Sequence, residues 1–208
     1  MAFSDRESGA VSKTYGPLSD GSSINCFSVL PGNVMASGGS NRSVILWDLR
    51  TRAQRKILGV HFGSVLSMDV RTDTNAATSF LAAGDATGTI FLYNLLDTSL
   101  APKALHPFDA QEVKALTFDK YAPGPVLCAA SSKGMITSVD CENASPIWSL
   151  KAHTGEISSL VQSQVNGNII TVGDDKKMII SSSRSSKYLH SFFLLYFTIF
   201  TALRLIAY

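Results

Sequence analysis

The stretch SGGSNRSVILWDL, residues 37–49, decides the fold of this chain. Its polar turn, Gly38-Gly39-Ser40-Asn41, follows the end of one extended segment and precedes a β-branched segment that closes on Trp47-Asp48. Two extended segments joined by a glycine-containing turn predict an antiparallel hairpin. A single Trp-Asp pair arises by chance, so the interpretation depends on whether the pattern recurs.

The pattern does recur, at nearly constant spacing. The column of Trp47 continues with Tyr93, Val139 and Ser181, which are 46, 46 and 42 residues apart. A second column places a polar residue four positions before an apolar strand start in every unit, with steps of 41, 48 and 44 residues. Its members are Asp20, His61, Asp109 and His153. A period of about 40–45 residues predicts repeats of one supersecondary unit.

The composition favours a folded all-β chain. Helical periodicity is almost absent, and short β-branched or aliphatic runs alternate with Gly, Ser, Asp and Asn. The net charge of +2 indicates no nucleic-acid partner, and 45% hydrophobic residues exclude wholesale disorder. The three cysteines, Cys26, Cys128 and Cys141, form no C-x-x-C pair, so neither a disulfide framework nor a metal site is predicted.

Each unit divides into four short strands. The expected units cover about residues 20–60, 61–108, 109–152 and 153–183. The expected strands are 24–30, 34–37, 43–49 and 54–58, then 65–70, 80–83, 89–95 and 103–105, then 113–118, 126–130, 135–141 and 147–150, and finally 157–161, 169–172, 177–182 and 187–190. Residues 3–5 and 11–15 are expected to be strands of a preceding unit, and residues 73–75 a hairpin turn.

These columns resemble the WD40-repeat family over about residues 3–183. The resemblance implies an all-β propeller segment of about four blades in an incomplete ring. It also implies a buried hydrogen-bonded network in each blade, made by a His, a Ser or Thr, an Asp and the Trp. The positions carried over are Asp20, Ser37, Asn41 and Trp47 in the first unit, His61, Ala83, Thr87 and Tyr93 in the second, and His153, Thr171, Asp175 and Ser181 in the fourth. The third unit, with Asp109, Ala129, Lys133 and Val139, cannot build the network.

Within the family, two segments resemble the WD40 proteins that target the γ-tubulin ring complex to centrosomes. They are residues 37–49 and the stretch from Gly173 to Ile180, with two degenerate units between them. This resemblance implies a role in microtubule and centrosome organisation, with γ-tubulin complex components as partners.

Seven cationic residues are candidate contacts for protein partners. They are Arg50, Arg52, Arg55, Lys56, Lys133, Lys176 and Lys177. The alternative for each is a solvated turn or outer strand. The sequence has no P-loop and no G-x-S-x-G motif, so no catalytic, cofactor or metal site is expected and the chain is interpreted as a non-enzymatic scaffold.

The chain changes character after Ile180. Residues 184–208 are expected to be a polar linker followed by a hydrophobic tail, with the uncharged run SFFLLYFTIFTAL at 191–203. Three interpretations stay open: a helical membrane anchor over about 188–208, an outer strand to about Phe193 followed by a non-native extension, and an unusual continuation of the propeller. The N-terminal residues lack a secretory signal, so we expect a cytoplasmic protein, or a membrane-tethered one if the tail is an anchor.

Overall fold

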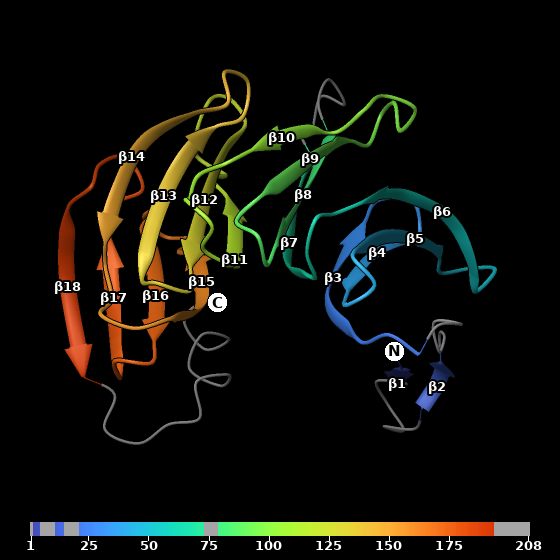
Figure 1. Cartoon of the computed structure of the whole chain (residues 1–208), viewed down its shortest axis with the longest axis horizontal. Coiled ribbons are helices and arrows are strands. Elements are labelled where there is room, and N and C mark those ends of the chain that lie inside the picture. Colours follow the sequence, from blue (N-terminus) through green and yellow to red (C-terminus); the bar gives the residue numbers. More distant parts are fainter. Residues whose placement is uncertain (1, 5–10, 15–20, 73–78, 194–208) are drawn as a thin grey trace.

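The computed structural model describes residues 2–4, 11–14, 21–72 and 79–193. These residues form four four-stranded antiparallel sheets and one two-stranded sheet, which confirms the predicted all-β fold (Figure 1). Asp20, the predicted turn at residues 73–75 and the chain from residue 194 onward lie outside the described residues.

Each four-stranded sheet is one blade, and consecutive strands pair in sequence order. The first blade contains β3 (Ile24–Leu30), β4 (Val34–Gly39), β5 (Ser43–Asp48) and β6 (Ala53–Val60). The second contains β7 (Val65–Thr72), β8 (Ser79–Asp85), β9 (Ile90–Asn94) and β10 (Lys103–Leu105). The third contains β11 (Val113–Phe118), β12 (Val126–Ser131), β13 (Met135–Asp140) and β14 (Ser145–Lys151). The fourth contains β15 (Ile157–Gln162), β16 (Ile169–Gly173), β17 (Lys177–Ser181) and β18 (Tyr188–Phe193). The small sheet pairs β1 (Ala2–Ser4) with β2 (Val11–Thr14).

The repeat extends to the irregularities of the strands. In every blade the pairing of the first two strands shifts register at the same place, just after the first residue of the first strand. The shifts lie between Ile24 and Cys26, Val65 and Ser67, Val113 and Ala115, and Ile157 and Ser159. A bulge at this point increases the local twist of the strand. The four sheets are therefore copies of one unit.

The core lies between the blades. The first strands β3, β7, β11 and β15 follow one another side by side, and apolar side chains from consecutive blades form shared clusters. Between the first two blades, Val44 and Leu46 meet Val65, Leu81 and Tyr93. Among the described residues no comparable packing joins β15 to β3, so the blades form an open arc (Figure 1).

Two glycines allow the blades to approach. A Cβ added to Gly38 would lie 2.4 Å from Val65 Cγ1, and one added to Gly84 would lie 2.5 Å from Val113 Cγ1. The equivalent residue of the third blade is Ala130, which shares a buried cluster with Ile157. A small residue at this position of the second strand therefore leaves space for the side chain that begins the first strand of the next blade.

Residues 188–193 form the outer strand β18 of the fourth blade. This part of the predicted membrane anchor is therefore paired with β17, and the remainder of the anchor lies outside the described residues. Within the described ranges, no helix has the length and hydropathy needed to cross a bilayer.

Candidate functional site

A buried polar network in the second blade centres on His61. The imidazole Nδ1 lies 3.3 Å from a carboxylate oxygen of Asp85, and Nε2 lies 3.2 Å from the Tyr93 hydroxyl. With the proton on Nδ1 donated to the carboxylate, Nε2 accepts the hydrogen bond from Tyr93. His61, Asp85 and Tyr93 are all at least 96% buried, because their relative exposures are 2%, 0% and 4%. The histidine is therefore closed off from solvent.

Asp85 is the acidic member of this network, and the repeat alignment missed it. The alignment had assigned that place to Thr87, which instead donates its hydroxyl and its amide to the Asp85 carboxylate at 2.6 and 2.9 Å. Burial raises the pKa of Asp85, but hydrogen bonds from His61, Thr87 and Thr89 outweigh burial and lower the pKa to about 2. The carboxylate stays ionised at neutral pH.

The fourth blade holds a second network of the same kind. His153 Nδ1 lies 2.8 Å from Asp175, and its Nε2 lies 3.0 Å from the Thr171 hydroxyl. The structure thus brings together three of the residues predicted for this unit. Ser181 stands where the aromatic residue belongs, and its buried hydroxyl has no hydrogen-bond partner within the described residues. The network ends there.

The first and third blades carry shorter networks. Trp47 Nε1 donates a 2.7 Å hydrogen bond to the Ser37 hydroxyl, as the repeat pattern predicts. Asn41 does not join them; it accepts the Ser43 amide at 3.1 Å inside its own turn. In the third blade, Ser131 donates its hydroxyl to Gln111 at 2.8 Å, a pair that the alignment did not identify.

These networks consist of internal contacts between strands and turns. Within the described residues, no group of three or more His, Cys, Asp or Glu side chains could hold a metal ion. Buried polar groups that satisfy one another hold a fold in a single arrangement. We interpret the networks as structural, and we look for the functional surface among exposed residues.

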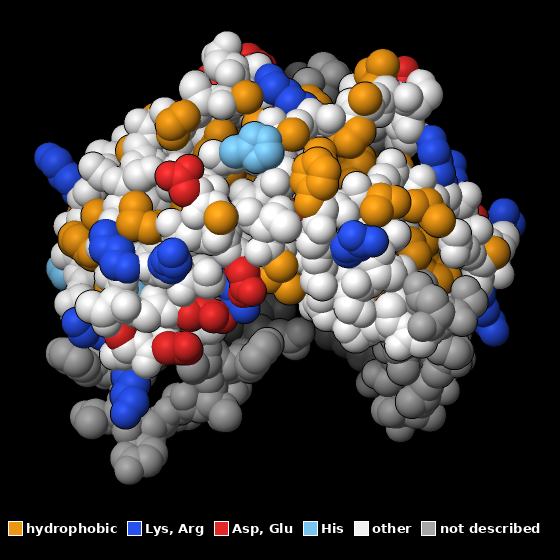
Figure 2. Space-filling view, in the orientation of Figure 1, with side chains coloured by type: hydrophobic (Ala, Val, Ile, Leu, Met, Phe, Trp, Pro, Cys, Tyr) orange, Lys and Arg blue, Asp and Glu red, His pale blue; other side chains and the backbone are white. Residues whose placement is uncertain are grey.

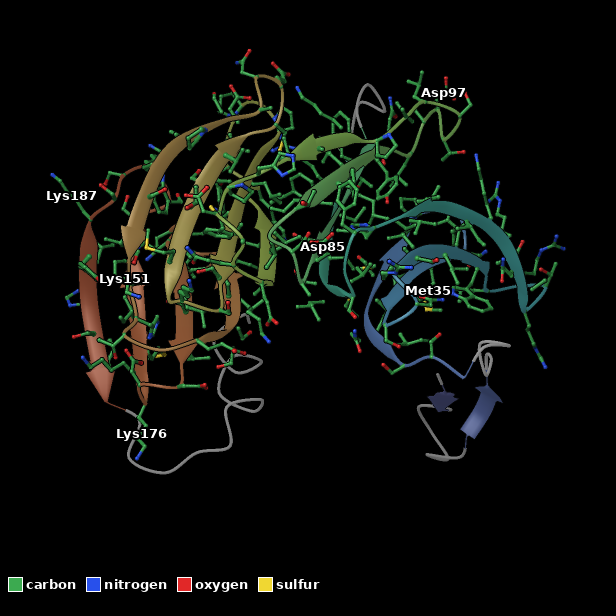
Figure 3. All side chains as sticks on the ribbon, viewed as in Figure 1. Met35, Asp85, Asp97, Lys151, Lys176 and Lys187 are labelled. Carbon is green, nitrogen blue, oxygen red and sulfur yellow. The ribbon has the colours of Figure 1, made fainter. Side chains whose placement is uncertain are left out.

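The predicted cationic contacts fall into two groups at opposite ends of the strands. Arg50 and Arg52 occupy the β5–β6 turn and Arg55 and Lys56 lie on β6, all of them exposed. Lys133, Lys176 and Lys177 lie at the turns between the second and third strands of the last two blades. In Figure 3, Lys176 projects from one end of the blades and Asp97 lies at the other. Lys56 of the first group bonds to Thr98, the residue after Asp97.

Two members of the first group, Arg55 and Lys56, line a groove between the first two blades. The groove has a volume of about 480 Å³. Its lining is Leu30, Pro31, Val34, Leu46, Arg55, Lys56, Ser79, Leu95, Leu96 and Thr98. Sequence reasoning identified the cations but not the groove, because its walls come from five separate segments of the sequence.

Comparison with known proteins agrees with this architecture. The family described as "WD domain, G-beta repeat" matches residues 144–181. Protein NEDD1 of Homo sapiens is 26% identical over 155 residues, which is 74% of this chain and 23% of the human protein. Periodic tryptophan protein 1 of Saccharomyces cerevisiae is 26% identical over 145 residues, which is 68% of this chain and 25% of the yeast protein. The chain thus spans about a quarter of the length of either relative.

The matched segment, 144–181, runs from β14 of the third blade to the end of β17. The same four-stranded unit, with the same register shift, occurs in all four blades. Residues 144–181 are therefore similar to a WD40 repeat, and the other blades share the architecture of that unit.

Proposed function

We propose that the chain is a protein-interaction scaffold without catalytic activity. WD40-repeat proteins are typically non-catalytic scaffolds. The observation that carries the proposal is the contrast between closed networks around His61 and His153 and an open, partly apolar groove beside exposed cations. Rigid blades that keep their titratable groups buried and offer a shaped surface suit partner binding.

We further propose a cytoplasmic role in centrosome and microtubule organisation, with γ-tubulin complex components as partners. The motifs at 37–49 and at the fourth blade support it, together with the similarity to NEDD1. Periodic tryptophan protein 1 is as similar to the chain as NEDD1 is, with 26% identity over nearly the same length, so sequence similarity alone does not choose between the two relatives. A test of the pathway therefore has to measure partner and location together.

The test is expression of the tagged full chain in cultured cells, with imaging against a centrosome marker and co-purification of γ-tubulin. We expect centrosomal enrichment and recovery of γ-tubulin complex components from the wild type. The variant Gly84→Leu, which should disrupt packing between blades, is the folding control and should lose both. A diffuse signal without recovery of γ-tubulin would contradict the centrosomal role. The scaffold proposal would then be tested by binding assays alone.

The absence of catalysis has its own test. Replacing His61 and His153 together by Asn should lower the free energy of unfolding, because both imidazoles are buried and hydrogen-bonded. If the double variant kept its thermal stability while a cellular activity disappeared, the histidines would have a chemical role and the proposal would be wrong.

A further inference from the structure

We propose that the groove between the first and second blades binds an acidic protein segment that inserts a large apolar side chain. This inference deepens the scaffold proposal and rests on it. It concerns one surface, the groove lined by Leu30, Leu46, Lys56, Leu95 and Leu96, called here the blade 1–2 groove.

The groove has the size and the lining of a side-chain pocket. Its volume of about 480 Å³ falls in the range of ligand sites, about 300–1,000 Å³. Leu30, Val34 and Leu46 are buried members of the core between the blades, and Leu95 and Leu96 add to the apolar lining. Leu96 stands at the surface with 57% of its area exposed. An inserted apolar side chain would bury this surface and gain hydrophobic stabilisation.

At the boundary between the second and third blades, an arginine side chain of the protein lies at the position equivalent to the groove. Arg71 holds the repeat position of Leu30, and its guanidinium donates to the carbonyls of Asp119, Ala122 and Gly124 at 2.9, 3.3 and 2.7 Å. These bonds join β7 to the β11–β12 loop across the boundary between the blades. At this boundary the arginine side chain therefore takes the place that Leu30 has at the first boundary.

The boundary between the third and fourth blades has a smaller groove. Its groove has about 240 Å³, half the volume of the first. Trp148, which holds the repeat position of Lys56, donates its indole proton to the Ser183 carbonyl at 3.0 Å. Of these two grooves, the one between the first and second blades is the larger.

The charges around the blade 1–2 groove favour an acidic occupant. Arg55 and Lys56 are the two cations of its lining, which contains no Asp or Glu. Two carboxylates lie next to lining residues without belonging to the lining: Asp48, which pairs with Val34, and Asp97, between Leu96 and Thr98. Both carboxylates are engaged: Asp48 accepts the amides of Arg50 and Thr51, and Asp97 accepts the amide and hydroxyl of Ser99.

Lys56 is held in position at the edge of the groove. Its ammonium donates to the Thr98 carbonyl at 2.7 Å and to the Thr98 hydroxyl at 3.0 Å, which ties β6 to the loop after β9. Arg55 has no hydrogen-bond or ion-pair partner within the described part of the chain. On the side of the molecule that carries β6, hydrophobic side chains lie next to Lys and Arg side chains (Figure 2). An apolar floor beside two cations fits a carboxylate-flanked leucine or phenylalanine better than a nucleic-acid backbone, which offers no apolar side chain.

The test is fluorescence anisotropy of the full chain with a labelled peptide in which two leucines are flanked on both sides by glutamates. Control peptides replace the leucines by serines or the glutamates by lysines, and a labelled single-stranded DNA serves as a second polyanion. We expect binding of the first peptide alone, weakened by added salt.

Two variants of equal charge change locate the site. Arg55→Glu/Lys56→Glu should weaken peptide binding by at least about tenfold, whereas Lys133→Glu/Lys176→Glu should leave it unchanged. Because Lys56 has an internal partner, Leu96→Ser is added as a variant of an exposed side chain, and it should weaken binding without lowering the midpoint of thermal unfolding.

Three results would overturn the inference. They are absence of binding to the wild type, equal loss in both charge variants, and equal binding of the DNA or the serine peptide. If the peptide fails while γ-tubulin or another purified protein still binds the chain, the groove assignment is wrong and the scaffold function stands. If no protein binds either, the scaffold proposal itself fails.

Discussion

Gly84→Ala tests the packing between blades. The added Cβ would lie 2.5 Å from Val113 Cγ1 and 2.7 Å from Val113 Cβ, distances at which the side chains must shift. Val113 is fully buried at the start of β11, and its β-branched side chain has little rotamer freedom. The second and third blades must therefore separate locally to admit the methyl group.

The expected cost is about 2 kcal/mol of unfolding free energy, the middle of the range for overpacked cores. Urea denaturation followed by the fluorescence of Trp47 and Trp148 measures it, and the midpoint should fall by about 1 M. Gly124→Ala is the matched control, because a Cβ at that position has no heavy atom within 4 Å. It should change the free energy by less than about 0.5 kcal/mol.

The partner variant Val113→Ala supplies a second check. Alone it should destabilise the chain by removing buried methyl groups, but combined with Gly84→Ala it should cost less than the sum of both. If Gly84→Ala left the midpoint unchanged, or if the two costs simply added, the blades would not pack as described.

Three further predictions concern the polar contacts. Because the pKa of Asp85 falls to about 2 from about 3.9 in an unfolded chain, its network should contribute about 2–3 kcal/mol of unfolding free energy above pH 5, which is lost as the pH falls toward 2. Asp85→Asn should flatten this part of the stability-versus-pH curve, and an unchanged curve would contradict the pairing with His61. Trp47→Phe, which leaves the buried Ser37 hydroxyl without its donor, should cost about 1–3 kcal/mol in thermal or urea unfolding, and a cost near zero would contradict the 2.7 Å bond. Arg71→Met should lower the free energy of unfolding by about 2–4 kcal/mol, because three carbonyls lose their donor. Arg71→Lys, measured in the same way, should recover only part of this loss, since one ammonium cannot reproduce the planar fork of the guanidinium. Full recovery by the lysine would contradict the planar contact.

The strands were predictable because the repeat fixes them. The hairpin around Gly38 and Trp47 recurs at a nearly constant spacing. The first strands of the first and third units, Ile24–Leu30 and Val113–Phe118, end where the sequence predicted. The outer strands were less well defined. Predicted as residues 187–190, the last one runs from Tyr188 to Phe193, because an edge strand carries no alternation of buried and exposed residues that marks its end.

The polar network of the second blade could be predicted only in part. A column of equivalent positions identifies His61 and Tyr93 but assigns the acid to Thr87, because the acid of the fourth blade, Asp175, stands at that position. Asp85 lies two residues earlier, at the end of β8, and reaches the same histidine. The carboxylate that pairs with the histidine is therefore identified by its distance in the structure, and not by its position in the repeat alignment.

The blade 1–2 groove was not predictable from sequence. Its cations were visible as a cluster, but its floor unites Leu30, Leu46 and Leu95 from β3, β5 and the loop after β9. Likewise, the sequence did not show that Arg71 crosses to the third blade, because its partners are 48 to 53 residues away.

Hydrogen–deuterium exchange of the full chain, with and without the leucine–glutamate peptide, tests the central claim most directly: these blades are an interaction module whose binding surface is the blade 1–2 groove. Amides exchange slowly where a partner covers them or stabilises their strand. The account predicts added protection in β6, Ala53–Val60, and in residues 95–100, with no change in β13 or β14. Protection confined to the third and fourth blades, or none anywhere at saturating peptide, would contradict it.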